Sequence, residues 1–151
     1  MRLTVTTPLA IVIDTEDVAH LRAEDDTGLF GILPGHADFL TSLALSIASW
    51  RDERGVEHYL AVRGGMLEVR GGGHITIAAP EAVPGADLRR LERDVLADFR
   101  RRLDEEKAAR TDAQRLYLAA IRQICRFLRP EREPILPAGF GAGTGDGIEA
   151  S

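Results

Sequence analysis

Cysteine, aromatic residues and long apolar runs are all scarce in this chain of 151 residues. The single cysteine, Cys125, cannot form an internal disulfide, which suits a reducing compartment. No apolar run approaches the ~20 residues that a membrane-spanning helix needs, and the first twenty residues lack the pattern of a signal peptide. We therefore expect no direct membrane insertion, so that any association with a membrane must go through an embedded partner.

Basic residues are outnumbered, with 19 lysines and arginines against 24 aspartates and glutamates and a formal net charge of −5. Proteins that coat nucleic-acid phosphates normally have a clear basic excess. The densest basic stretch, Arg100–Arg102, lies among acidic residues. Helical i,i+4 spacing pairs Asp98 with Arg102 and Glu106 with Arg110. We interpret this stretch as the solvated face of a helix, and nucleic acid is not a predicted partner.

Motifs for catalysis and metal binding are also lacking. The histidines lie in separate segments and show no H-E-x-x-H or Cys/His spacing: His20, His36, His58 and His74. No nucleophile elbow and no phosphate-binding loop occurs, despite 15 glycines. We therefore expect no catalytic residue, no metal site and no cofactor in this chain.

The sequence does contain a strong β pattern between Leu3 and Ala79. Apolar residues alternate with polar ones in short runs, which is typical of half-buried strands. Glycine pairs at Gly64-Gly65 and within Gly71–Gly73 predict tight hairpins between three of these strands. The number of runs is high enough to predict two packed sheets or a flattened barrel.

A helical pattern follows the β region. Pro80 and Pro84 are predicted to end the sheet, and Asp87 to cap a helix that begins at Leu88. The spacing Thr111–Gln114 predicts that the helix restarts there. A two-helix hairpin is the economical interpretation, although one continuous long helix remains open if another protein covers its apolar stripe.

These patterns predict a mainly β fold with a helical appendage. Residues 1–84 are predicted to form a β-sandwich or flattened barrel, and residues 85–130 a C-terminal helical hairpin. Residues 131–151 are rich in glycine and proline and are predicted to be disordered. Because the boundary is rich in proline, we expect a chain that ends near Pro84 to fold without the helices.

The segment from Gly28 to Leu43 is unusual because it combines glycines and a proline with many apolar side chains. Its glycines and proline shape a loop, and it contains more apolar surface than a solvent-exposed loop usually has: Phe30, Ile32, Leu33, Phe39 and Leu40. Two interpretations are open at this point. The apolar side chains either fold back into the sandwich or form a surface for a partner protein.

This segment resembles the hallmark of the epsilon subunit family of bacterial and chloroplast ATP synthases. The family pattern G-x-x-G-I-x-P-G-H-A followed by L-x-T-x-L is matched by Gly28, Gly31, Ile32, Pro34, Gly35, His36, Ala37, Leu40, Thr41 and Leu43. A second family pattern, V-x-G-G-x-x-E-V, is matched from Val62 to Val69. The layout of a β-sandwich, a linker and two helices also agrees over about 130 residues.

The resemblance implies a non-catalytic rotor subunit of an F-type ATP synthase. Its sandwich would bind the gamma subunit and the ring of c subunits at the cytoplasmic face of the bacterial inner membrane. The helical region would regulate ATP hydrolysis and reach the alpha/beta catalytic head. The residues that would form the partner interface are Gly28, Leu29, Phe30, Gly31, Ile32, Leu33, Pro34, Gly35, His36 and Phe39.

The chain departs from the family pattern at several positions. Leu29 stands where members commonly have an acid that faces the c ring, and Asp38-Phe39 stands where many have Pro-Leu. These differences suggest a divergent branch, such as the alternative synthase operon of some bacteria. Asp87 and Arg90 are the remnant of the ATP-binding pattern of some members, and Leu91 replaces its alanine, so we expect poor ATP binding or none.

Two other functions compete with this one. The first is a stand-alone β-sandwich binding module that dimerises through its helical hairpin. The second is an enzyme that uses His36 and Asp38 as an acid/base pair. Under either function, the match of the hallmark segment to the family pattern would be a coincidence.

Overall fold

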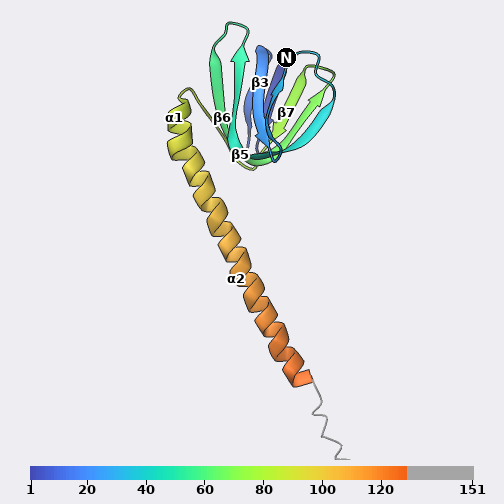
Figure 1. Cartoon of the computed structure of the whole chain (residues 1–151), viewed down its shortest axis with the longest axis vertical. Helices are drawn as coiled ribbons and strands as arrows, with labels where there is room; N and C mark the ends of the chain where they lie inside the picture. The colour runs from blue at the N-terminus through green and yellow to red at the C-terminus, as the bar shows by residue number, and fades with distance from the viewer. Residues whose placement is uncertain (129–151) are drawn as a thin grey trace, which may run out of the picture. The chain divides into compact units, whose positions relative to one another are not determined.

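The computed structural model describes residues 1–128 (Figure 1). The chain divides after Lys107 into two units, Met1–Lys107 and Ala108–Ser151. The first unit is called the body below, and residues 108–128, the described part of the second, are called the distal helix. The tail expected at residues 131–151 lies outside the described residues.

The described residues contain eight strands: β1 (Arg2–Thr6), β2 (Ile11–Thr15), β3 (Val18–Asp25), β4 (Gly28–Ile32), β5 (Phe39–Asp52), β6 (Glu57–Arg70), β7 (His74–Ala78) and β8 (Ala82–Gly85). Their order is β2-β1-β7-β6-β5-β3-β4, and β8 pairs with β6. Strands β1 and β7 pair in parallel, whereas the other pairs are antiparallel. The strands curve around one main core to form the predicted β-sandwich (Figure 1).

The main core confirms the alternating pattern of the sequence. Strand residues two apart, such as Leu67 with Val69 and Ile75 with Ile77, are at most 1% exposed. Burying each such side chain is worth about 1.5–3 kcal/mol relative to leaving it exposed. The core is therefore the main source of stability of the body.

Strands β5 and β6 form the longest ladder, which runs from the pair Phe39↔Val69 to the pair Arg51↔Glu57. The predicted hairpin at Gly64-Gly65 is wrong, because these residues lie inside β6. Gly65 has a φ of +118°, and a Cβ there would lie 2.3 Å from the Ala78 carbonyl oxygen. The two glycines therefore allow one strand to bend and pair with β7 beyond the bend and with β8 before it. The predicted turn at Gly71–Gly73 is confirmed.

The expectation that both prolines stand outside the sheet is wrong for Pro84. It lies in β8, opposite Leu60 of β6. Proline lacks a backbone N–H, but β8 pairs with β6 alone, and an edge strand tolerates the missing donor.

The helical region begins with α1 (Leu88–Arg90), continues through a π-helical turn η1 (Leu91–Leu96) and becomes α2 (Ala97–Leu128). The predicted cap is confirmed, since the Asp87 carboxylate accepts hydrogen bonds from the backbone N–H groups of Arg89 and Arg90. Leu91 and Leu96 are five residues apart, and the wider π-helical turn places both on the buried side of the helix.

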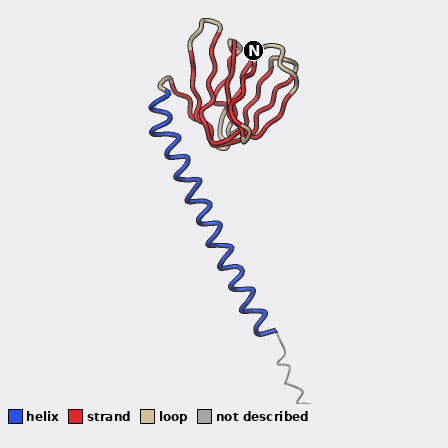
Figure 2. Tube along the Cα trace, in the orientation of Figure 1, coloured by secondary structure: helices blue, strands red, loops and turns tan. Residues whose placement is uncertain are grey.

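The hairpin predicted within residues 85–130 differs from the structure, in which α2 passes through Arg110 and Thr111 without a break (Figure 2). No glycine or proline occurs between Ala97 and Leu128, and the spacing of Thr111 and Gln114 is as compatible with a helix interior as with a helix start. The continuous helix that the sequence left open is the form observed. Among the described residues, no helix is both long and apolar enough to cross a membrane.

Candidate partner-binding surface

The hallmark segment, residues 28–43, is built from β4, a loop at residues 33–38 and the beginning of β5. Gly28 and Gly35 have positive φ angles of 126° and 83°. No atom lies within 4 Å of a Cβ built on either residue, so both glycines are required by the backbone conformation and not by lack of space. Glycine is therefore needed at the start of β4 and in the loop that follows this strand.

The apolar side chains of this segment divide into two groups: some fold back into the sandwich, and the others stay exposed. Ile32 is fully buried in the main core, and Phe30 and Phe39 pack against that core. The rings of Phe30 and Phe39 meet edge to face, with centroids 5.6 Å apart. By contrast, Leu29, Leu33 and Leu40 are 77%, 58% and 62% exposed.

Hydrogen bonds join the loop to the turn between β6 and β7. The backbone N–H of Gly35 donates to the Gly72 carbonyl oxygen at 2.7 Å. The Asp38 carboxylate accepts from the Gly71 N–H at 2.9 Å. A Cβ on Gly72 would lie 3.2 Å from the Cα of Gly35, so the two loops are in close backbone contact. The contact holds the backbone of the loop that contains Leu33.

His36 and Asp38 each contact the backbone. The Nδ1 atom of His36 lies 2.7 Å from the Ala37 carbonyl oxygen, and its ring meets Phe39 with centroids 5.8 Å apart. The Asp38 carboxylate is used by Gly71. No hydrogen bond between the His36 and Asp38 side chains occurs in the described part of the chain, so the geometry gives no support to an acid/base pair.

Asp25 supports the hallmark segment and was missed by the sequence analysis. Its carboxylate accepts hydrogen bonds from the N–H and hydroxyl of Thr27 and from the hydroxyl of Thr41, at 2.8, 2.6 and 2.8 Å. The Thr27 and Thr41 hydrogen bonds hold the pKa of Asp25 below its usual range. Thr41 of the hallmark therefore ties β5 to the β3–β4 turn. The signal in the sequence was the Asp-x-Thr-Gly turn at residues 25–28.

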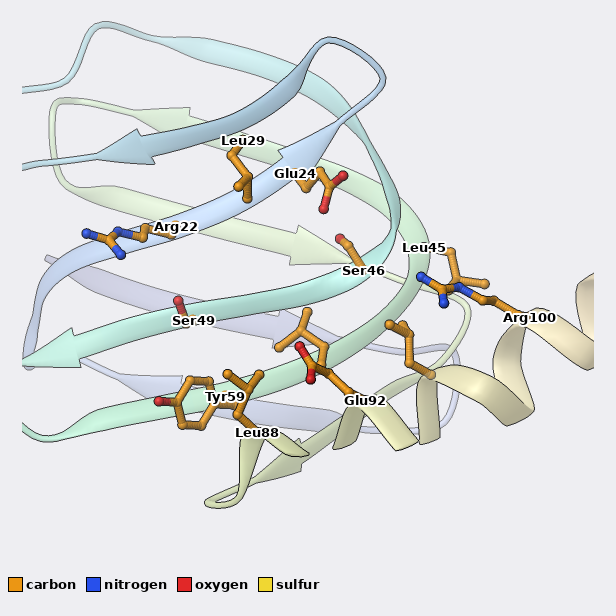
Figure 3. A pocket seen from close by; sticks show the side chains of 12 residues that line it. Arg22, Glu24, Leu29, Leu45, Ser46, Ser49, Tyr59, Leu88, Glu92 and Arg100 are labelled. Carbon is orange, nitrogen blue, oxygen red and sulfur yellow. The ribbon is translucent and has the colours of Figure 1, made fainter. Parts of the chain in front are cut away.

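A surface cavity of about 450 Å³ adjoins the exposed side of Leu29 within the body (Figure 3). Its apolar side chains come from both the sheet and the helix: Leu29, Leu45, Ile47, Leu88 and Leu96. Charged side chains also line it, from β3 and from the helical region: Arg22, Glu24, Glu92 and Arg100. The apolar and charged side chains of this cavity lie next to the hallmark segment, because Leu29 belongs to both.

In the remnant of the ATP pattern, Asp87 and Leu91 have structural roles. The Asp87 carboxylate caps the helix, and Leu91 is 4% exposed and packs with Ala61. Poor ATP binding stays a prediction. Within residues 1–128, no group of three or more His, Cys, Asp and Glu side chains is placed to hold a metal ion.

Comparisons with known proteins give a consistent result. Residues 1–85 match the family model described as ATP synthase, Delta/Epsilon chain, beta-sandwich domain. The chain is 41% identical over 132 residues to the "ATP synthase epsilon chain 2" of Paraburkholderia xenovorans, covering 87% of this chain and 95% of the relative. It is 43% identical over 128 residues to the protein of the same name from Cereibacter sphaeroides, covering 85% and 88%.

Solved structures agree with the sequence comparisons. A chain of the Euglena gracilis mitochondrial ATP synthase, in an OSCP/F1/c-ring structure, matches with a TM-score of 0.55 and 28% identity, covering 70% of this chain and 62% of that chain. A chain of the Tetrahymena thermophila mitochondrial ATP synthase, in a central stalk/c-ring structure, has a TM-score of 0.51 and 16% identity, covering 62% and 71%. The second match is a likeness of fold alone.

Proposed function

The chain belongs to the delta/epsilon family of ATP synthase subunits, as a non-catalytic epsilon-type subunit of the central stalk, and we propose how it binds there. The hallmark segment is its contact with the gamma subunit and the c ring. Family membership removes the support for a stand-alone binding module. The shared name "epsilon chain 2" of two relatives supports placing the chain in a divergent branch of the family.

The observation that carries this proposal is a set of exposed leucines on a backbone that is fixed from both sides. Leu29 and Leu33 are exposed in the β4–β5 region. Its loop is hydrogen-bonded to the β6–β7 turn, and its strand β5 is tied to Asp25 through Thr41. Preorganised apolar side chains bind with little loss of conformational entropy. The residues proposed for the interface are Gly28, Leu29, Phe30, Gly31, Ile32, Leu33, Pro34, Gly35, His36 and Phe39.

Within this interface the residues have different roles. Leu29 and Leu33 touch the partner, whereas Ile32 and Phe30 hold β4 on the core. Because Leu29 is uncharged, its contact with the c ring is apolar and not an ion pair. Through these contacts the chain is held at the cytoplasmic face of the membrane without entering it.

The helical region is proposed as the regulatory part, in contact with the alpha/beta head. The distal helix exposes a stripe of large apolar side chains between 38% and 82%: Leu116, Tyr117, Leu118, Ile121, Ile124, Phe127 and Leu128. An amphipathic helix is stabilised by covering such a stripe. The hairpin predicted from Thr111–Gln114 is retained as a second conformation, in which part of the stripe is covered by the chain itself.

The substitution Leu33→Asp tests the proposed interface. A carboxylate at this position stays desolvated against a partner, so we expect binding to purified gamma subunit with the c ring to weaken at least about tenfold, or ~1.4 kcal/mol. Leu9→Asp is the matched control, because Leu9 is 96% exposed and lies outside the hallmark segment. Both variants should unfold at the temperature of the parent chain. Parental affinity of Leu33→Asp would remove the hallmark segment from the interface.

A further inference from the structure

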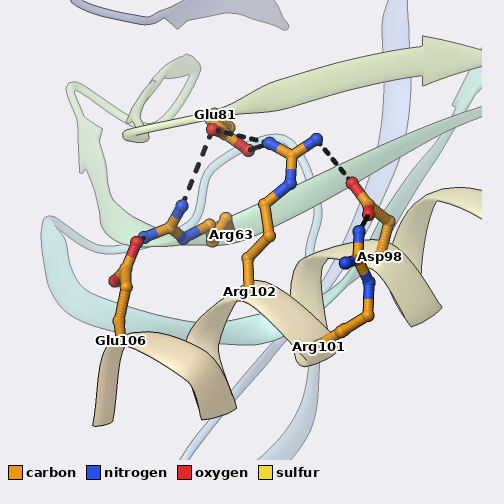
Figure 4. Close-up of polar contacts among 6 residues, drawn as sticks. All are labelled: Arg63, Glu81, Asp98, Arg101, Arg102 and Glu106. Atoms are coloured by element: carbon orange, nitrogen blue, oxygen red, sulfur yellow. Dashed lines mark hydrogen bonds and ion pairs between the residues drawn. The ribbon is translucent and has the colours of Figure 1, made fainter. Parts of the chain in front are cut away.

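A cluster of charged residues joins the beginning of α2 to the sheet (Figure 4). We call it the base clamp and define it as Arg63 of β6, Glu81 of the β7–β8 loop, and Asp98, Arg102 and Glu106 of α2. Arg63 lies 2.6 Å from the Glu106 carboxylate and 3.6 Å from that of Glu81. Arg102 lies 3.3 Å from Glu81 and also contacts Asp98. The clamp thus connects residues that are up to 43 positions apart in the sequence.

Arg63 is the centre of the clamp. Its side chain is 18% exposed, compared with 53% for Arg51 in the surface pair Arg51–Glu57. The Arg63 backbone N–H also donates to the Glu81 carbonyl oxygen at 3.0 Å. Isolated exposed ion pairs contribute little, but a network of several charges around a partly buried arginine is screened less. Hydrogen bonds from Arg101 hold the pKa of Asp98 below its usual range, so this carboxylate stays charged beside Arg102.

An apolar contact lies on the same side of the helix. Leu91, Leu96 and Phe99 are 4%, 7% and 3% exposed. Leu91 and Phe99 pack with Ala61 and with partly buried side chains of the sheet: Leu45, Ile47 and Tyr59. The helix and the sheet therefore form a second small core, which the sandwich without its helix would leave open to water.

Beyond Leu103 the described residues of α2 are all exposed. Phe99 is the only buried residue among the described residues of α2, and residues 108–128 are all exposed. The last clamp residue, Glu106, is followed by Lys107, the last residue of the body. The ion pairs and the buried side chains that join the helix to the sheet thus all lie before Ala108, in a helix that has no sequence break.

We propose that the base clamp makes residues 88–107 a permanent part of the body, so that conformational change of the helical region begins at Ala108. This places the mechanical boundary more than twenty residues beyond the one predicted at Pro84. The inference concerns the chain by itself and does not rest on the proposed contacts with the gamma subunit or the c ring. It predicts that a regulatory signal reaching the distal helix leaves the first turns of the helix on the sheet.

Amide hydrogen exchange of the full chain, followed by mass spectrometry, tests this inference. In the parent chain we expect peptides from residues 91–107 to exchange slowly and those from residues 108–128 to exchange fast. Arg63→Met and Glu106→Gln should each speed exchange at residues 97–107 about fivefold or more, which corresponds to ~1 kcal/mol. The double variant should exchange no faster than the faster single variant, because the two residues act as a pair.

Arg51→Met is the matched control, since it removes an arginine from an ion pair of similar length at 2.8 Å that does not touch the helix. It should leave exchange at residues 97–107 unchanged. If Arg63→Met disturbs the fold, Glu106→Gln still decides the question, because Glu106 is 45% exposed and its amide keeps the shape. The proposal is overturned if residues 97–107 exchange as fast as residues 108–128 in the parent chain, or if the two single effects simply add.

Discussion

Residues 88–107 and residues 108–128 belong to one helical region and have the same kind of amphipathic sequence, yet their environments are opposite. The first stretch has buried apolar residues and ion pairs to the sheet, whereas the distal helix exposes its entire stripe. Periodicity predicts that both stretches are helical. It does not say what covers the stripe, because that depends on which surface lies opposite. In the first stretch the sheet supplies that surface, whereas the stripe of the distal helix is exposed.

Truncating one phenylalanine in each stretch gives the largest expected difference. Phe99 is 3% exposed, so Phe99→Ala should lower the free energy of unfolding of the body by about 3–5 kcal/mol. Phe127 is 82% exposed, so Phe127→Ala should change it by less than ~0.5 kcal/mol. Urea unfolding followed by the fluorescence of Trp50, the only tryptophan, measures both.

The fluorescence of Trp50 reports on the body because this residue is part of the main core. Far-ultraviolet circular dichroism of the same samples follows the helix as a control. Equal losses for the two variants would contradict the division after Lys107. They would mean that the distal helix is as much a part of the cooperative unit as the first turns.

Replacing Asp25 is expected to give a smaller effect that depends on pH. Because the pKa of Asp25 is lower in the folded chain than in the unfolded chain, its hydrogen bonds stabilise the fold above the ordinary carboxyl value of ~3.9. This contribution is lost as the pH falls through the lower folded pKa. Asp25→Asn should therefore lower the stability of the body at pH 7 and weaken its dependence on pH in the acid range.

Thr41→Val removes one of the donors to Asp25 and should give a weaker form of the same change. The measurement is the urea midpoint as a function of pH, again from Trp50. Superimposable curves for parent and Asp25→Asn would show that this carboxylate does not tie the hallmark segment to the body.

The sequence predicted features that depend on neighbours along the chain. The alternating core, the Asp87 cap, the turn at Gly71–Gly73 and the local pair Asp98–Arg102 are all found in the structure. Each depends on spacing within a few residues, which the sequence displays directly.

Features that depend on distant residues could not be predicted in this way. The pattern at Gly64-Gly65 fits a hairpin as well as a bend, and only the approach of Ala78 distinguishes them. Glu106 was paired with Arg110 on helical spacing, whereas the structure pairs it with Arg63 of the sheet. The exposed leucines were recognised as unusual, but their separation from the buried phenylalanines required the fold.

We expect the body alone to bind the central stalk, without any contribution from the distal helix. The most direct test compares the full chain with a chain ending at Lys107 in equilibrium binding to purified gamma subunit with the c ring. Trp50 fluorescence confirms that both are folded. We predict affinities within about threefold of each other, less than ~1 kcal/mol. A folded chain ending at Lys107 that binds more than about tenfold more weakly, ~1.4 kcal/mol, would contradict the claim.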